Sequence, residues 1–186
     1  MRAVIETPRL RLATIGISQA PEALDFVLRN REFLQPWEPL REPEYYTLEA
    51  QRRLIAFDSE CMEQGSLLKL WISKRVSPGR FIGSVSLSNI VRGAFLSCHL
   101  GYRMDERETG KGYMTEAVKY AAEYAFRELG LHRIEANVMP RNEASRRVVR
   151  KLGFREEGLA LRYLKINGKW EDHVHMVLLN DEMERP

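Results

Sequence analysis

The stretch from Arg107 to Met114, RETGKGYM, joins a strand-like run to the longest helical pattern of the chain. Two glycines this close together weaken either a helix or a strand, so they indicate a loop. Residues 94–104, before the loop, read as a strand, and the apolar residues of 113–129, after it, recur at helical spacing. A strand, a glycine loop and a helix in this order predict a fold that mixes helices with a sheet.

The first third of the chain predicts one strand and two helices. Residues 9–15 alternate polar and apolar side chains as a strand does, and Ser18 is placed to cap a helix to about residue 30. The proline-punctuated segment 31–46 cannot be one long helix, so we expect a loop or short turns there. Thr47 then opens a second helix, which Gly65 ends.

The remaining strands are expected on both sides of the glycine loop. Before it, three strands with a turn at Ser77–Arg80 form an antiparallel meander over residues 67–74, 81–91 and 94–104. After the helix come a strand over 132–139, a helix capped by Asn142 to about residue 152, and a hairpin turning at Asn167-Gly168 between strands 154–166 and 170–178.

The predicted order is therefore βααβββαβαββ, an α+β (mixed α/β) fold with a mostly antiparallel sheet. No linker or repeat divides the chain, so we expect one domain over residues 1–186 with a core from about 7 to 178.

Composition predicts a soluble globular protein. The chain is 44% hydrophobic and 30% charged, as ordinary domains are, and no apolar run approaches the roughly 20 residues of a membrane span. The N-terminus lacks the apolar region of a signal peptide, and the net charge of +3 is too small to argue for nucleic acid. Cys61 and Cys98 are expected to be free thiols, which fits the cytoplasm.

The glycine loop has the chemistry of an anion site. Unpaired backbone N–H groups and the helix dipole attract phosphate where a loop enters a helix. The loop is not a Walker loop, because Gly112 follows Lys111 where Ser or Thr is needed, and Thr115 stands where the dinucleotide pattern needs its third glycine. The alternative interpretation is a plain flexible turn.

A second helix start follows the strand over 132–139. The segment 139–154 carries five basic residues against the single acid Glu143, and most of them are expected to form a solvated face. Because the two helix starts follow successive strands of the sheet, they could flank one ligand with several phosphates.

These motifs together resemble the GNAT acetyltransferases. RETGKG fits R-x-x-G-x-G, and Asn142 and Ser145 fit N-x-x-S, with LGF beginning ten residues after the Asn. The similarity covers nearly the whole chain and the order of its elements. Five further stretches narrow it to the RimJ/RimL type, the ribosomal-protein N-terminal-alanine acetyltransferases, and to RimJ more than RimL: NREFLQPWEPLRE, SNIVRGAF, LGYRM, HRIEANVMPRNEAS and NGKWEDHV.

The resemblance implies acetyl-CoA as co-substrate and a splayed central sheet. The strand over 94–104 would separate from that over 132–139, and its backbone at Tyr102, Arg103 and Met104 would pair with the pantetheine arm. Asn142 and Ser145 would lie beside the pantetheine near the thioester. The diphosphate would be held by backbone N–H groups of Arg107, Glu108, Thr109, Gly110, Lys111, Gly112, Tyr113 and Met114.

The implied reaction is direct attack of an amine on the thioester. An α-amine has a pKa near 7.7–8.0 against about 10.4 for lysine, so an N-terminal acceptor needs only a gentle base. The candidates are Glu38, in the loop that would border the acceptor groove, Asn137 and Glu135, which share a strand face, and His99. Each of these also has a plain structural interpretation.

Two positions depart from the family pattern. Many GNATs carry a tyrosine seven residues after the Asn as the acid for the thiolate, and this chain has Val149 there. The expected acid is therefore Ser145. RimL-like sequences also carry a glutamate where this chain has Leu164. A general-base role for that glutamate therefore cannot be transferred to this chain.

The resemblance favours acetylation of the N-terminal α-amine (Ala or Ser) of a protein, expected to be ribosomal. The alternatives are a GNAT enzyme acting on a small amine, such as an antibiotic or polyamine, and a non-catalytic acyl-CoA-binding module. No metal is expected, because His173 and His175 share a strand face but lack further ligands in the pattern. We expect a monomer or weak dimer and no membrane partner.

Overall fold

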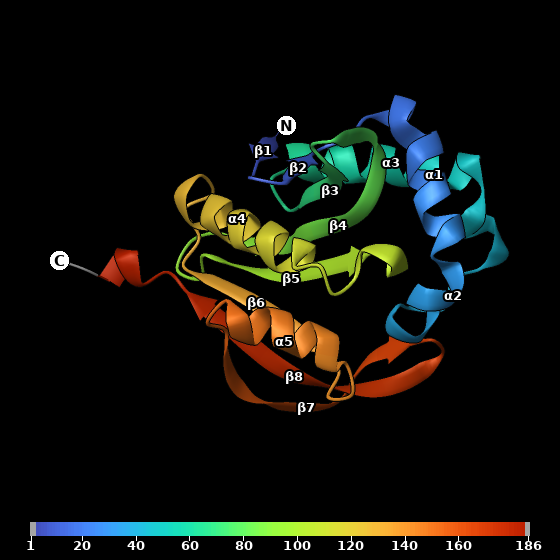
Figure 1. Cartoon of the computed structure of the whole chain (residues 1–186). Coiled ribbons are helices and arrows are strands. Elements are labelled where there is room, and N and C mark those ends of the chain that lie inside the picture. The colour runs from blue at the N-terminus through green and yellow to red at the C-terminus, as the bar shows by residue number, and fades with distance from the viewer. Residues whose placement is uncertain (1–2, 185–186) are drawn as a thin grey trace.

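A computed structural model describes residues 3–184 of the chain (Figure 1). The described strands form one eight-stranded sheet in the order β1-β2-β3-β4-β5-β6-β8-β7. Only the β5–β6 pair is parallel, and the other neighbours are antiparallel. The strands are β1 (Val4–Glu6), β2 (Leu10–Ala13), β3 (Leu68–Lys74), β4 (Ser77–Val91), β5 (Ser97–Met104), β6 (Arg133–Val138), β7 (Arg155–Ile166) and β8 (Lys169–Leu179).

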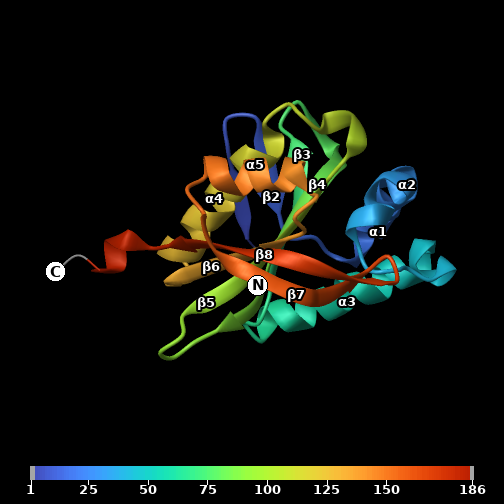
Figure 2. The ribbon, with the colours of Figure 1, turned by 90° about the horizontal axis from the view of Figure 1, so that it is seen from below.

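Helices cover both faces of this sheet (Figure 2). Two lie on one face, where Ala117 and Ala121 pack into the larger hydrophobic core: α4 (Tyr113–Arg127) and α5 (Glu143–Lys151). The others build a smaller core around Phe26 and Trp71 toward the opposite face: α1 (Ala20–Arg29), α2 (Arg31–Leu34) and α3 (Leu48–Glu63). The small alanine side chains let α4 approach the strands closely.

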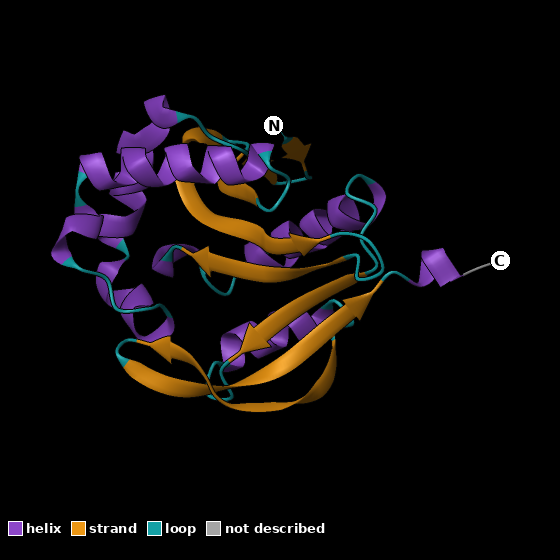
Figure 3. Cartoon of the chain, turned by 180° about the vertical axis from the view of Figure 1, so that it is seen from behind, coloured by secondary structure: helices purple, strands orange, loops and turns teal. Residues whose placement is uncertain are grey.

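The sheet opens between β5 and β6. The two strands pair only where Ser97–His99 face Arg133–Glu135. Beyond His99 and Glu135 they diverge, and each pairs only with its outer neighbour, β4 or β8 (Figure 3). The predicted splay is therefore confirmed, and the inner backbone edges of residues 100–104 and 136–138 have no strand partner.

The predicted fold class is confirmed, with one strand added to the element order. β1 was not predicted, because a strand of only three residues is too short to show alternation. The segment 31–46 folds as short turns, as expected: α2 is followed by 3-10 turns over Gln35–Trp37 and Pro43–Tyr46. All strands of residues 3–184 join this one sheet.

Two local predictions are wrong. Ser18 does not cap α1, because a 3-10 turn over Ile17–Gln19 precedes the helix and Gln19 takes the cap position. Ser77–Arg80 is not a turn but the start of β4, since the chain already reverses at residues 75–76. Irregular register around Ser73 absorbs the extra residues that the Pro-Gly pair brings.

Candidate active site

Gly110 and Gly112 both adopt the left-handed backbone conformation. Their φ angles are +74° and +78°, a region that residues with a Cβ rarely occupy. Gly112 is the N-cap residue of α4, and a Cβ on Gly110 would meet nothing within 4 Å. The loop therefore needs glycine for its own shape, and it exposes its backbone at the helix start.

The backbone N–H groups that remain available to a ligand lie in the second half of this loop. The N–H groups of Arg107, Glu108 and Thr109 already donate to oxygens of Asp105 and Glu106. The first amides of α4 have no acceptor within the helix. None of the backbone hydrogen bonds outside helices and strands in residues 3–184 uses the amides from Gly110 to Met114. An anion at the loop would thus meet amides from residue 110 onward.

Glu108 organises the cations beside the loop. Its carboxylate is buried, and it accepts hydrogen bonds from Lys74 Nζ at 2.8 Å and Lys111 Nζ at 2.9 Å. Burial alone would raise the pKa of Glu108, but the two lysines outweigh it and hold the pKa below its ordinary value. The side chain of Glu108 therefore stays charged and fixes Lys111, which is a role that sequence reasoning did not assign to it.

Arg9 is a second loop contact that sequence reasoning missed. Its Nη1 donates to the backbone oxygen of Lys111 at 3.0 Å, and its Nε pairs with Glu116 of α4 at 2.5 Å. The guanidinium also lies over the ring of Tyr113, 4.6 Å from its centroid. Arg9 precedes Lys111 by 102 positions, so no local pattern could link them.

Asn142 caps α5 as predicted. Its Oδ1 accepts the backbone N–H of Ser145 at 3.1 Å, which fixes the first turn of the helix beside the splay.

The hydroxyl of Tyr102 is the most informative contact at the splay. It lies 2.6 Å from Ser145 Oγ, so it joins β5 to the first turn of α5. Burial raises the pKa of Tyr102 to about 12, with a smaller opposing effect from Ser145, so the phenol keeps its proton near neutral pH. Sequence reasoning used only the backbone of Tyr102. The signal it missed is that Tyr102 lies on the strand face that meets Ser145.

Asn137 and His175 meet on the opposite face of the splay. They are direct partners in the β6–β8 register. Asn137 Oδ1 and His175 Nε2 are both buried, and neither has a hydrogen-bond partner among the described residues. Tyr163 lies against the His175 ring with centroids 5.0 Å apart. Buried polar atoms are rarely left unpaired, so this pair points to a polar ligand, to which Asn137 Oδ1 offers an acceptor and His175 Nε2 an acceptor or a donor according to its tautomer.

Glu135 and His99 form a separate polar group on that face. Glu135 Oε1 accepts from Arg133 Nε at 2.8 Å, and its other oxygen lies 3.7 Å from His99 Nε2. His99 Nδ1 in turn contacts Asn89 at 3.2 Å. Both expected base candidates therefore already have partners.

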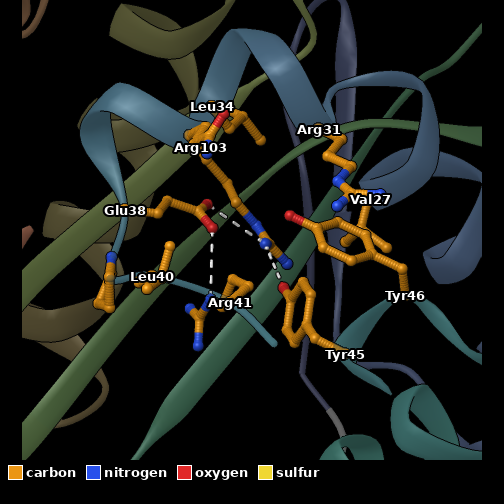
Figure 4. Close-up of a pocket in the computed structure, with 11 residues that line it drawn as sticks. Val27, Arg31, Leu34, Glu38, Leu40, Arg41, Tyr45, Tyr46 and Arg103 are labelled. Atoms are coloured by element: carbon orange, nitrogen blue, oxygen red, sulfur yellow. Dashed lines mark hydrogen bonds and ion pairs between the residues drawn. The ribbon is translucent and has the colours of Figure 1, made fainter. Parts of the chain in front are cut away.

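Glu38 lies in a pocket beneath the segment after α2, next to the side chain of Arg103 (Figure 4). Its Oε1 lies 3.4 Å from Arg103 Nη1, and its other oxygen lies 3.7 Å from Arg41 Nε. The backbone oxygen of Glu38 accepts the N–H of Asn167 at 2.8 Å. This hydrogen bond holds the tip of the β7–β8 hairpin against the segment after α2. The open space on the sheet face that carries Asn137 is therefore narrower at this end.

His173 is buried on the same strand as His175. Burial lowers its pKa, which favours the neutral imidazole. Among residues 3–184, no group of three or more His, Cys, Asp or Glu side chains could hold a metal ion. In the same range, no helix is long and apolar enough to cross a membrane. Cys61 and Cys98 are free thiols, as predicted.

Comparison with known proteins gives consistent matches. Residues 9–155 match the family described as acetyltransferase (GNAT) domain. The chain is 44% identical to "Probable N-acetyltransferase YjcK" of Bacillus subtilis, over 92% of this chain and 94% of that one. It is 36% identical to the ribosomal protein uS5-alanine N-acetyltransferase of Escherichia coli, over 91% and 87% of the two chains.

A solved structure shares the whole fold. Mycobacterium smegmatis RimJ, in complex with CoA-disulfide, superposes with a TM-score of 0.90 at 28% identity, covering 99% of this chain and 89% of that one. The expected resemblance to the RimJ/RimL type is therefore confirmed. The glycine loop, the capped α5 and the splayed sheet stand where the resemblance implied them, and the chain belongs to the GNAT acetyltransferase family.

Proposed function

We propose that this enzyme transfers the acetyl group of acetyl-CoA to the N-terminal α-amine of a protein that begins with Ala or Ser. A ribosomal protein is the expected acceptor, in the cytoplasm, because the 36%-identical relative is named for that activity. The observation that carries the proposal is the unpaired acceptor pair, Asn137 Oδ1 and His175 Nε2, across the splay from the Tyr102–Ser145 hydroxyls.

Acetyl-CoA would bind along the splay. Its diphosphate would accept hydrogen bonds from the amides of residues 110–114, at the positive end of α4. Its pantetheine arm would pair with the free backbone edge of β5 at Tyr102, Arg103 and Met104, as an added strand does. Asn142, by capping α5, holds Ser145 beside that edge.

The acceptor amine would enter from the face that carries Asn137. A neutral α-amine has two N–H donors, which match the two unpaired acceptors, Asn137 Oδ1 and His175 Nε2. These bonds would leave the nitrogen lone pair free to attack the thioester carbon. Glu38 is a weaker choice for the base, because its carboxylate is already engaged by Arg103 and Arg41.

Attack forms the C–N bond and breaks the C–S bond. The nitrogen loses one proton, for which His175 Nε2 is the nearest proposed acceptor, and the sulfur leaves with the electron pair. Ser145 Oγ can accept from Tyr102 while donating its own hydrogen to the sulfur. The pKa of Tyr102, about 12, keeps the proton on its phenol, so Tyr102 can donate to Ser145 Oγ and orient the Ser145 hydroxyl toward the developing thiolate.

A peptide assay tests this function. The purified chain is incubated with acetyl-CoA and peptides that begin with Ala or Ser and contain one internal lysine, and released thiol and peptide mass are measured. We expect one acetyl group on the α-amine and no turnover when that amine is blocked. Equal acetylation of the lysine, or turnover of polyamines and aminoglycosides but no peptide, would overturn the proposal.

A further inference from the structure

The pocket beneath the segment after α2 is not used by the transfer chemistry. We call it the arginine pocket; its polar lining consists of Arg31, Gln35, Glu38, Arg41, Tyr45, Tyr46 and Arg103. The cavity measures about 30 Å³, which is about the space that two water molecules need. The side chains of Glu38 and Tyr45 converge on Arg103 at its centre (Figure 4).

The pocket holds a surplus of positive charge. Three guanidinium groups face one carboxylate, that of Glu38. The ion pairs of Glu38 with Arg103 and Arg41 are long, at 3.4 and 3.7 Å, so neither is a tight bidentate pair. Arg31 forms no ion pair within the described residues, and its guanidinium lies over the ring of Tyr46, 4.5 Å from the centroid.

Arg103 is a fixed cation at the floor of the pocket. Its side chain is 14% exposed, and its guanidinium lies over the rings of Phe26 and Trp71, 5.2 and 5.3 Å from their centroids. The hydroxyl of Tyr45 accepts from its Nη1 at 2.9 Å. A charge held in place and largely shielded from water attracts an anion more strongly than a mobile surface lysine does.

The pocket lies within reach of an acceptor chain whose amine is at the splay. Arg103 shares its strand face with Gly101 and His99, opposite to the face that Cys98 and Leu100 bury in the larger core. Same-face neighbours on a strand are about 7 Å apart, which is about the span of two extended residues. At the end of this sheet face, the hydrogen bond from the Asn167 N–H to the Glu38 backbone oxygen closes the space between the β7–β8 hairpin and the segment after α2.

We propose that the arginine pocket takes the carboxylate of an Asp or Glu side chain within the first four residues of the acceptor. A carboxylate group is small enough for this cavity. Its two oxygens can accept hydrogen bonds from the guanidinium groups of Arg31 and Arg103 and from the hydroxyl of Tyr46. This inference rests on the proposed function and adds the class of acceptor: an N-terminus followed closely by an acidic residue.

The test uses the same assay with a matched peptide series. Each peptide begins with Ala, ends in an amide, and carries Glu, its neutral isostere Gln, or Lys at one of positions 2 to 4. We expect the best Glu peptide to exceed its Gln partner in kcat/KM by about ten-fold, the effect of one contact of about 1.4 kcal/mol. The difference should lie mainly in KM, because the contact is remote from the reacting atoms.

Three variants locate the preference. Arg31→Gln removes an exposed cation of the pocket and should reduce the Glu-over-Gln ratio to below about three-fold, with the Gln peptide unaffected. Arg31→Glu should favour the Lys peptide. Arg11→Gln is the control, because it removes an equal charge from β2, where the ion-pair partner of Arg11 among residues 3–184 is Glu6, at 3.3 Å; it should keep the wild-type ratio.

The outcomes separate the two proposals. If no Ala peptide is acetylated, the proposed function fails. If Ala peptides are acetylated but Glu and Gln peptides are equal in the wild-type enzyme, the arginine pocket inference fails and the function stands. A wild-type Glu preference that Arg31→Gln and Arg11→Gln reduce equally would also overturn the inference, because general charge attraction would then explain it.

Discussion

The proposed role of Tyr102 depends on one hydroxyl group, so Tyr102→Phe tests it with little change in packing. The variant keeps the ring but loses the contact with Ser145 Oγ at 2.6 Å. We expect kcat to fall by about 10- to 100-fold, with a nearly unchanged KM for acetyl-CoA, because the lost hydrogen bond acts on the leaving thiolate. Steady-state kinetics with the preferred peptide measure both constants.

Tyr124→Phe is the matched control for that experiment. Tyr124 lies on α4, half-buried, and its hydroxyl makes no hydrogen bond among the described residues. It should retain wild-type kcat. If Tyr102→Phe also retains it, Ser145 acts without Tyr102 and the proposed hydroxyl pair is wrong.

Within the sheet, Gly83 is the glycine with the least room for a side chain. A Cβ there would lie 2.6 Å from the backbone oxygen of Arg103 on β5. Gly83→Ala must therefore push β4 and β5 apart, and we expect the free energy of unfolding to fall by about 1–3 kcal/mol. Gly79 lies on the same strand, and a Cβ added there would meet nothing within 4 Å. Gly79→Ala should therefore change the free energy of unfolding far less. Chemical denaturation of both variants measures the difference, and equal losses would contradict the argument.

The elements themselves were largely predictable from the sequence. The period of two in residues 132–139, the Asn142 cap and the Asn167-Gly168 turn are local signals, and the structure confirms each of them. The errors also have local causes. Pro-Gly at residues 78–79 signals a turn, but pairing of Lys74 with Ser77 moves the turn to residues 75–76. Tertiary pairing overrides turn propensity there.

The site was less predictable, because its contacts join distant parts of the chain. Arg9 reaches Lys111, Tyr102 reaches Ser145, and Asn137 meets His175. Local periodicity shows which face a side chain occupies, but not which residue of another element lies opposite to it. The residue pattern predicted the order of the elements and an anion-binding loop, and the resemblance to a family named acetyl-CoA as its ligand, whereas the side-chain partners needed the folded structure.

Across the whole molecule, Asp105 joins the start of the glycine loop to α1. Its buried carboxylate accepts from Arg29 Nε of α1 at 2.8 Å and from the Arg107 amide at 3.0 Å. Asn30, just after α1, accepts the Glu106 amide at 3.0 Å. Burial alone would raise the pKa of Asp105, but Arg29 and the Arg107 amide outweigh it, so the pKa lies below its ordinary value.

This lowered pKa predicts how stability depends on pH. A carboxyl group whose pKa is depressed by folding stabilises the fold above its unfolded pKa, near 3.9, and that contribution is lost as the pH falls through the folded value. Asp105→Asn should therefore cost about 2 kcal/mol at pH 7, and progressively less below about pH 4. Unfolding free energies at pH 7, 5 and 3.5 test this. A pH-independent difference would mean that the charge of Asp105 contributes nothing.

The central claim is that the free amides of residues 110–114 hold the diphosphate of acetyl-CoA, and amide NMR of the labelled protein tests it most directly. Titration with coenzyme A should shift the amide resonances of Gly110, Lys111 and Gly112 most strongly. Pantetheine, which lacks the diphosphate, should shift resonances of β5 and leave those of the loop in place. If coenzyme A shifts amides elsewhere and leaves these unchanged, the account is wrong.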